Sequence, residues 1–161
     1  MSDVVYTSRT RLERRVGPMK VAYLPGEPNP VVFSVHGAIA EHYKVNPASL
    51  TEPHSSTLDY LVAATAACMM GTFGGALEAR HIDASGGRLT AEVEGELELE
   101  QNVLVVRRIN VVYKLVAPKE AQATVERVHG FYAMNCPMYR TLHTVIQISS
   151  TYILVETPTA P

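Results

Sequence analysis

The clearest alternation of apolar and polar residues follows Gly86-Gly87. Between residues 89 and 100, apolar side chains alternate with threonine and glutamate, which is the pattern of a half-buried antiparallel strand. After Gln101-Asn102 a second β-rich run, Val103 to Val116, supplies Arg107, Arg108 and Lys114 as cross-strand partners for the glutamates. The two runs predict a hairpin. Because its glutamates share one solvated face, we interpret them as structural rather than catalytic.

The middle of the chain is apolar on every side. Ser55-Ser56-Thr57 supplies an N-cap, Ser56 and Asp59 form an approximate capping box, and the helix is expected to occupy residues 55–80. The segment from Leu61 to Leu77 has no charge and is just long enough to span a membrane. It is mostly Ala, Gly and Thr and has no basic flank, which favours a buried helix instead.

The first third of the chain predicts a strand meander, residues 1–53. Its strands are Val4 to Leu12, Met19 to Leu24 and Val31 to Val35, followed by a long loop from His36 to Pro53. After the hairpin, a helix beginning at Pro118 carries Val125, Val128 and Tyr132 on one side. A short helix follows from Cys136 to about His143, and Ile146 to Val155 is a closing strand, so this C-terminal region is residues 86–155.

This order of elements predicts an α+β fold, with an antiparallel sheet packed on a long central buried helix. A single sheet covers only one side of that helix, so a second subunit is the simplest cover for the other side.

Composition narrows the function classes. With 161 residues, 47% of them hydrophobic, the chain fits one domain spanning residues 1–161. A net charge of -2 offers no basic face to nucleic acid, and the amino terminus shows no apolar signal segment. We therefore expect a cytoplasmic protein with neither nucleic acid nor membrane as a partner, in a compartment where paired cysteines tend to be catalytic or redox-sensing.

The two cysteines, Cys68 and Cys136, are the candidate chemical groups. They lack the number and spacing of a disulfide scaffold or a zinc site, which leaves redox chemistry or burial. Cys136 directly precedes Pro137, so free N–H groups and the helix dipole would lower the pKa of its thiol. Cys68, in mid-helix, needs a cation from elsewhere, so local physics makes Cys136 the more acidic thiol.

Together these residues resemble a known family. The chain contains, in this order, the segments STLDYLVAATAACMMGTF, EVEGELE and NCPMYRTL. Their order resembles that of the OsmC/Ohr family of osmotically induced and organic hydroperoxide resistance proteins. The similarity covers roughly Ser55 to Val155. It implies an OsmC-like fold assembled as an intertwined homodimer, with two sites at the subunit interface.

The resemblance also implies a reaction. Cys68 matches the peroxidatic cysteine, which attacks an organic hydroperoxide and becomes a sulfenic acid, and Cys136 matches the resolving cysteine, which condenses with it. A dithiol or thioredoxin-type reductant would reset the disulfide. No metal or organic cofactor is required.

One family feature differs here, and a second, an arginine near the amino terminus, has more than one candidate. Peroxidases of the family use a glutamate ten residues before the first cysteine, where this chain has Leu58; the nearest acid, Asp59, cannot reach the sulfur directly. Asp59 is therefore a candidate for orienting an arginine, for acting in a partner's site, or for capping the helix. For the activating arginine the candidates are Arg14 and Arg15, with Arg9 and Arg11 as alternatives, or all four are surface residues.

Six histidines complete the candidate list. His36, His42 and His54 lie in or beside the predicted loop but match no metal-ligand motif, whereas His81, His129 and His143 resemble helix-end or surface residues. Three functions stay open: a cysteine-based hydroperoxide reductase, a binding protein of the same fold with an interfacial pocket, which Leu58 favours, and a structural dimer with inert thiols.

Overall fold

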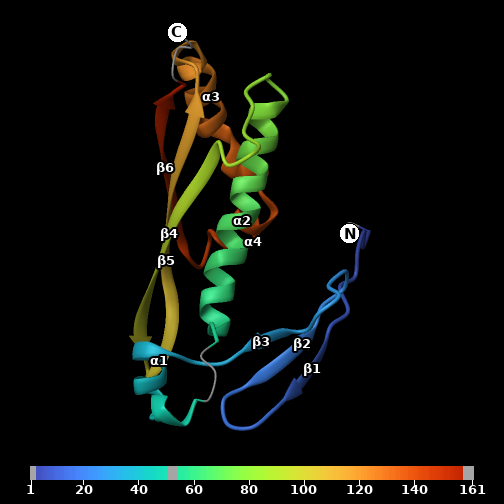
Figure 1. Cartoon of the computed structure of the whole chain (residues 1–161), viewed down its shortest axis with the longest axis vertical. Helices are drawn as coiled ribbons and strands as arrows, with labels where there is room; N and C mark the ends of the chain where they lie inside the picture. Colours follow the sequence, from blue (N-terminus) through green and yellow to red (C-terminus); the bar gives the residue numbers. More distant parts are fainter. Residues whose placement is uncertain (1–2, 51–53, 158–161) are drawn as a thin grey trace. The chain divides into compact units, whose positions relative to one another are not determined.

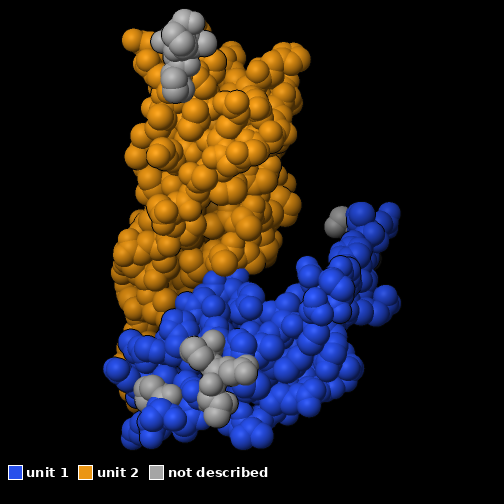
Figure 2. Space-filling view, in the orientation of Figure 1, with its two compact units in different colours: residues 1–60 blue, residues 61–161 orange. Residues whose placement is uncertain are grey.

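The computed structural model describes residues 3–50 and 54–157. The chain forms two compact units, residues 1–60 and 61–161, which are coloured separately in Figure 2 and are described one at a time. The predicted α+β class is confirmed, with two three-stranded sheets and one long central helix.

The first unit contains a small antiparallel sheet of β1 (Arg11–Arg14), β2 (Lys20–Tyr23) and β3 (Val31–Phe33). A short helix, α1 (Gly37–His42), and a 3-10 turn, η1 (Pro47–Ser49), follow. The ring of Tyr60 packs edge-on against Phe33, with centroids 4.6 Å apart. This contact ties the first turn of the next helix to β3.

Two predictions for this unit were wrong in detail. The strand expected from Val4 to Leu12 begins only at Arg11, because its partner β2 is four residues long and reaches no farther than Arg11. The expected loop from His36 contains α1 and η1; its end, residues 51–53, lies outside the described residues.

The second unit is built on the long helix α2 (Thr57–Glu78), which runs beside a sheet of β4 (Leu89–Glu100), β5 (Val103–Ala117) and β6 (Gln147–Glu156) (Figure 1). The predicted β4–β5 hairpin is confirmed, with Leu89 opposite Leu115 at one end and Glu100 opposite Val103 at the turn. Arg108 bonds both Glu96 and Glu98 at 2.5 Å, which confirms the predicted cross-strand pairing of arginine with these carboxylates.

The third strand corrects the expectation of an all-antiparallel sheet, because β6 pairs with β5 in parallel, from Arg108 opposite Gln147 to Ala117 opposite Glu156. Helical segments separate the two strands: η2 (Lys119–Ala121), α3 (Gln122–Phe131), η3 (Tyr132–Asn135) and α4 (Pro137–Leu142). Such a crossover returns the chain to the starting end of the sheet, which permits parallel pairing where a tight turn would not.

The core of this unit lies where α2, α3 and the sheet meet. Phe73 of α2 is fully buried, and its ring lies 5.0 Å from that of Tyr113 and 4.9 Å from that of Tyr132. The predicted inward face of α3 is confirmed, since Val125, Val128 and the following Tyr132 are all fully buried. Burying several large side chains in one cluster supplies the main hydrophobic stabilisation of the unit.

The opposite face of α2 is exposed. Ala63, Ala67, Gly71 and Gly75 recur at four-residue spacing and are all open to solvent in the single chain. Among the described helices, α2 alone is long and apolar enough to cross a bilayer, a property that core helices of water-soluble proteins share.

Candidate functional site

The two cysteines lie next to each other in the second unit. Cys68 is half-buried on α2 and Cys136 is fully buried before α4. The thiol of Cys136 lies 3.5 Å from the Cys68 sulfur, and both are free. A disulfide requires about 2.05 Å between sulfur atoms. A small movement is therefore enough to join them.

The start of α4 positions this pair. As predicted, Cys136 is the N-cap residue, in an extended conformation with φ -86° and ψ 123°, and Pro137 occupies the first turn. The Cys136 side chain makes no capping hydrogen bond to its own helix. Instead the backbone N–H of Met138 bonds the Cys68 sulfur. We expected the N-terminus of α4 to stabilise the thiolate of Cys136, but its N–H group bonds the sulfur of Cys68 instead.

The environment of Cys68 disfavours its thiolate. Burial raises the pKa of Cys68, and the neighbouring Cys136 adds to the increase, whereas the N–H of Met138 opposes it. Neither of these two neighbours is a cation. Within the second unit the thiol form of Cys68 therefore dominates at neutral pH.

A chain of hydrogen-bonded hydroxyl groups lies in the core of the second unit. Tyr113 and Tyr132, both fully buried, have hydroxyl oxygens 3.3 Å apart. Tyr132 donates to Ser150 Oγ at 2.7 Å, and Ser150 Oγ lies 3.1 Å from His129 Nε2. Burial raises the pKa of both tyrosines, and the nearby Cys136 raises them further.

Sequence analysis missed this hydroxyl chain and Met138. Tyr132 lies on the predicted apolar side of its helix and Tyr113 within the second strand of the predicted hairpin, and neither was given a polar role, although a buried hydroxyl requires a hydrogen-bonding partner. His129 lies in the last turn of its helix, close to the predicted helix end, but it is half-buried rather than a surface residue. Burial lowers its pKa.

Asp59 lies in the first unit and caps α2. Its carboxylate accepts from the backbone N–H of Ser56 at 2.6 Å and from the Ser56 hydroxyl at 2.7 Å, and it contacts His36 Nε2 at 2.8 Å. Although burial alone would raise it, the hydrogen bonds of Ser56 and His36 hold the pKa of Asp59 below its usual value. The predicted capping box is confirmed, and sequence analysis did not foresee His36 as a member of it.

The candidate arginines also belong to the first unit. Arg15 forms an ion pair with Glu13 at 2.5 Å and lies 3.5 Å from the Tyr23 hydroxyl. Arg11 also forms an ion pair with Glu13, and its guanidinium lies over the Tyr23 ring. Arg9 and Arg14 are exposed. Since each unit is described by itself, an arginine beside Cys68 stays a prediction.

The remaining histidines form no metal cluster. Within residues 3–50 and 54–157, no group of three or more His, Cys, Asp or Glu side chains is arranged to hold a metal ion. His42 is half-buried beside Tyr43, with ring centroids 4.8 Å apart, and His54 is half-buried just before α2.

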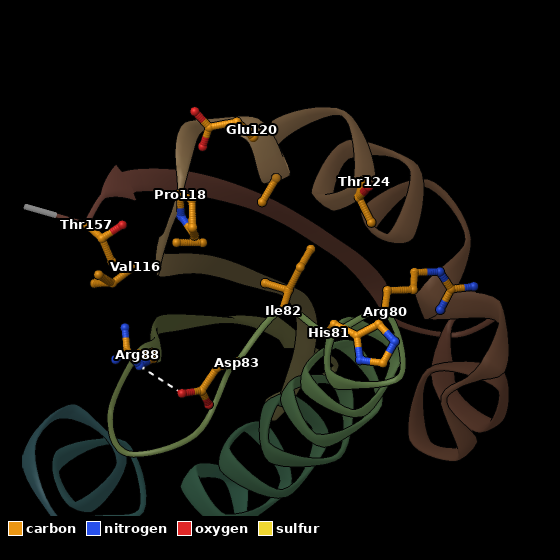
Figure 3. A pocket seen from close by; sticks show the side chains of 12 residues that line it. Arg80, His81, Ile82, Asp83, Arg88, Val116, Pro118, Glu120, Thr124 and Thr157 are labelled. Carbon is orange, nitrogen blue, oxygen red and sulfur yellow. Dashed lines mark ion pairs between the residues drawn. The ribbon is translucent and has the colours of Figure 1, made fainter. Parts of the chain in front are cut away.

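A separate hollow of about 480 Å³ lies beyond the end of α2 (Figure 3). Ile82, Val116 and Ala117 are among its apolar lining residues, and Arg88 and Asp83 at its rim are joined by an ion pair of 3.0 Å. Neither cysteine lines it. The cysteine pair and this hollow are therefore distinct features of the second unit.

Comparison with solved structures identifies the fold. An OsmC-like protein from Mycoplasma pneumoniae aligns over 95% of this chain and 99% of its own, with a TM-score of 0.69 and 15% identity. An OsmC-like protein of unknown function from Vibrio cholerae covers 92% and 100%, with a TM-score of 0.73 and 14% identity. The organic hydroperoxide resistance protein OhrB of Bacillus subtilis covers 94% and 100%, with a TM-score of 0.60 and 12% identity.

Comparison with curated protein sequences gives no match. A model of the OsmC-like protein family, however, matches residues 51–151, which include α2, both cysteines and most of the second sheet. On this match, which spans more than half of the sequence, the chain belongs to the OsmC-like family.

Proposed function

We propose that this protein reduces organic hydroperoxides through Cys68 and Cys136. The observation that carries the proposal is the 3.5 Å separation of the two sulfur atoms, one half-buried and the other fully buried. Cys68 is the more accessible cysteine and would react with the peroxide first. The buried Cys136 would then react with the oxidised Cys68. This division matches the peroxidatic and resolving roles that the family resemblance implies.

The reaction has two steps. The Cys68 thiolate attacks the distal oxygen of the hydroperoxide, the O–O bond breaks, and an alcohol leaves after taking up a proton, so that Cys68 becomes a sulfenic acid. Cys136 then attacks the Cys68 sulfur, forming a disulfide and releasing water. A dithiol or thioredoxin-type reductant returns both cysteines to thiols. In balance, two thiols and a hydroperoxide yield a disulfide, an alcohol and water.

The first step requires Cys68 as a thiolate, but the surroundings of Cys68 in the second unit favour the thiol. Because the pKa of Cys68 is raised, a cation from another part of the assembly has to stabilise the charge. Arg14 or Arg15 would supply it, since a guanidinium stays charged at all physiological pH values and its planar fork can hold both thiolate and peroxide. Asp59 would act through such an arginine, because it cannot reach the sulfur directly.

The assembly that we propose is a cytoplasmic homodimer joined through α2. Ala67, Gly71 and Gly75, exposed on the single chain, line a shallow hollow of about 400 Å³ together with Met70 and Leu89. Small residues at four-residue spacing allow another backbone to approach closely. A second copy of the same helix fits this face.

One observation favours a second function. Leu58 stands where peroxidases of the family have a glutamate, and the chain would then be a non-peroxidatic protein that binds a small molecule in an interfacial pocket. Such a protein has no need of two thiols in contact, which makes the reductase the better supported function.

Turnover distinguishes the two. Reduced protein, cumene hydroperoxide and dithiothreitol are mixed, and peroxide consumption is measured for the wild type and for Cys68→Ser and Cys136→Ser. The reductase predicts catalytic consumption that Cys68→Ser abolishes. Stoichiometric binding without consumption would support the binding protein instead.

A further inference from the structure

Tyr132 anchors the connection between α3 and β6 to the core of the second unit. Among residues 129–145, all of which the structure describes, only Tyr132 and Cys136 are fully buried. The other side chains of η3 and α4 are exposed or half-buried. Apart from Cys136 itself, Tyr132 is therefore the main anchor of the segment that carries Cys136.

Hydrogen bonds and ring contacts hold Tyr132 from several sides. Its hydroxyl donates to Ser150 Oγ on β6 at 2.7 Å, and the hydroxyl oxygen of Tyr113 on β5 lies 3.3 Å away. Its ring lies 4.9 Å from that of Phe73 and 5.5 Å from that of His129, between centroids. Phenylalanine would make the same ring contacts. What the hydroxyl adds is a directional bond that joins η3 to β6 at one point.

The backbone carries this anchorage to Cys136. Tyr132 begins η3, and Cys136 directly follows its last residue, Asn135. The Cys136 N–H donates to the carbonyl of Ala133 at 3.0 Å, which closes the turn. Pro137 restricts Cys136 to the extended conformation that is observed, with φ -86° and ψ 123°. A short hydrogen-bonded turn therefore links the Tyr132 ring to the Cys136 side chain.

We propose that Tyr132, bonded to Ser150, is a positioning residue that determines how readily Cys136 and Cys68 form a disulfide. The inference deepens the proposed function, on which it rests, by naming what controls the oxidation equilibrium of its cysteine pair. The two free sulfur atoms already lie 3.5 Å apart, so closure has little left to order. Without the bond to β6, Cys136 has more freedom as a thiol, and closing the disulfide costs more conformational entropy.

The oxidation can be followed with glutathione in place of a peroxide. The two protein thiols lose two protons and two electrons and form one S–S bond. Glutathione disulfide takes up both protons and both electrons and becomes two molecules of glutathione. The equilibrium constant of this exchange measures the effective concentration of one cysteine beside the other. No hydroperoxide takes part, so the measurement is independent of the proposed reaction.

The experiment equilibrates the protein at pH 7 with defined ratios of reduced to oxidised glutathione. Acid quenching, alkylation of free thiols and mass analysis then give the fraction of protein with a Cys68–Cys136 disulfide. Tyr132→Phe and Ser150→Ala each remove the bond between η3 and β6, and each is expected to lower the equilibrium constant about 5- to 10-fold. A purely structural bond would not do this, because a bond of equal strength in both redox forms leaves their ratio unchanged.

Tyr113→Phe is the matched control. It removes a hydroxyl from the same buried cluster but leaves the bond from Tyr132 to Ser150 in place, so its constant is expected to match the wild type. Ser150→Thr keeps the hydroxyl on a strand, where threonine is favoured, and should also match.

An unchanged or higher constant in Tyr132→Phe or in Ser150→Ala would overturn the inference, as would an equal decrease in Tyr113→Phe. A wild type that forms no disulfide with oxidised glutathione would overturn it too. If cumene hydroperoxide leaves the wild-type thiols intact while the glutathione equilibria follow the predicted pattern, the proposed function fails and the positioning role of Tyr132 stands.

Discussion

At the residue scale, Cys68 has two polar neighbours within its own unit: the N–H of Met138 and the thiol of Cys136. The first stabilises a thiolate, but burial and the second thiol outweigh it, and the pKa of Cys68 is raised. A neutral hydrogen-bond donor alone does not compensate a buried charge. Under the proposed function, rapid peroxide chemistry at neutral pH would require a cation from elsewhere, and we propose a guanidinium.

This dependence predicts an effect of the N-terminal arginines on Cys68. In an Arg14→Ala/Arg15→Ala variant, the pH profile of Cys68 alkylation by iodoacetamide, followed by peptide mass mapping, is expected to shift to higher pH, because removing a cation raises the pKa of the thiol. Arg107→Ala, which alters an arginine paired with Glu100 on β5, serves as the control. Coincident profiles for all three proteins would exclude both arginines as activators.

The sequence indicated which cysteines to examine but not what surrounds them. Cys136 was placed correctly at an N-cap because Pro137 is a local signal. The bond from Met138 to Cys68 and the bonds of Ser150 to Tyr132 and His129 join residues far apart in the chain, and no local pattern encodes such contacts. The resemblance to the family, not periodicity, paired Cys68 with Cys136.

At the element scale, α2 is defined by its two ends and by one close approach. Ser56 and Asp59 cap its N-terminus, as the sequence predicted. At its C-terminus, Ile82 donates to Leu77 at 3.1 Å and His81 donates to Glu78 at 3.0 Å, which is a Schellman motif. The residue that reverses the chain is His81, with φ +62°, where glycine is usual.

Replacing His81 with glycine should stabilise the protein. The side chain is exposed, so its removal costs little, while relief of the left-handed conformation is worth about 0.5 to 1 kcal/mol. Urea unfolding measures the change, and Glu78→Gly, inside the helix, should destabilise by about 1 kcal/mol. A loss of stability in His81→Gly would show that the imidazole makes contacts that outweigh the strain.

Gly95 marks the close approach of β4 to α2. A Cβ at this position would lie 2.5 Å from Val62 Cγ2 and 3.2 Å from Val62 Cγ1. Gly95→Ala is therefore expected to destabilise by about 1 to 3 kcal/mol through overpacking, and Val62→Ala in the same chain should recover part of the loss.

Gly130→Ala is the matched control for this substitution. No atom lies within 4 Å of a Cβ built there, and its helix favours alanine, so unfolding should become slightly harder. Additive effects of Gly95→Ala and Val62→Ala in a double-mutant cycle would contradict the proposed contact.

The sequence predicted which strands and helices exist better than it predicted how the strands pair. The period-two pattern after Gly86 placed β4 and β5 correctly, because each strand has one covered face. The parallel partnership of β6 was not foreseen, since strand direction depends on the path of α3 and α4 across the sheet. The short β1 was overestimated for a related reason: its length is limited by β2, not by its own residues.

At the scale of the whole molecule, one face of α2 leaves small uncharged residues open to solvent. Ala63, Ala67, Gly71 and Gly75 are open to solvent on a helix that carries no charge from Leu61 to Leu77. Leu99 and Val103, at the tip of the β4–β5 hairpin, are 57% and 53% exposed. Such apolar patches typically mark contact surfaces.

We therefore expect the protein to be a dimer in solution. Sedimentation equilibrium should give twice the mass of the chain, and Ala67→Arg should give a folded monomer, because a buried unpaired charge opposes association. Glu126→Arg, on the exposed side of α3, should leave the dimer intact. A monomeric wild type, or a dimeric Ala67→Arg, would contradict the assignment of this face.

The most direct test of the central claim is the mass of the reduced protein after one equivalent of cumene hydroperoxide. The account predicts a loss of about 2 Da in the wild type, from one disulfide, a gain of about 16 Da in Cys136→Ser, from a sulfenic acid at Cys68, and no change in Cys68→Ser. If the wild-type mass stays unchanged with both thiols free, Cys68 and Cys136 are not a peroxide-reducing pair.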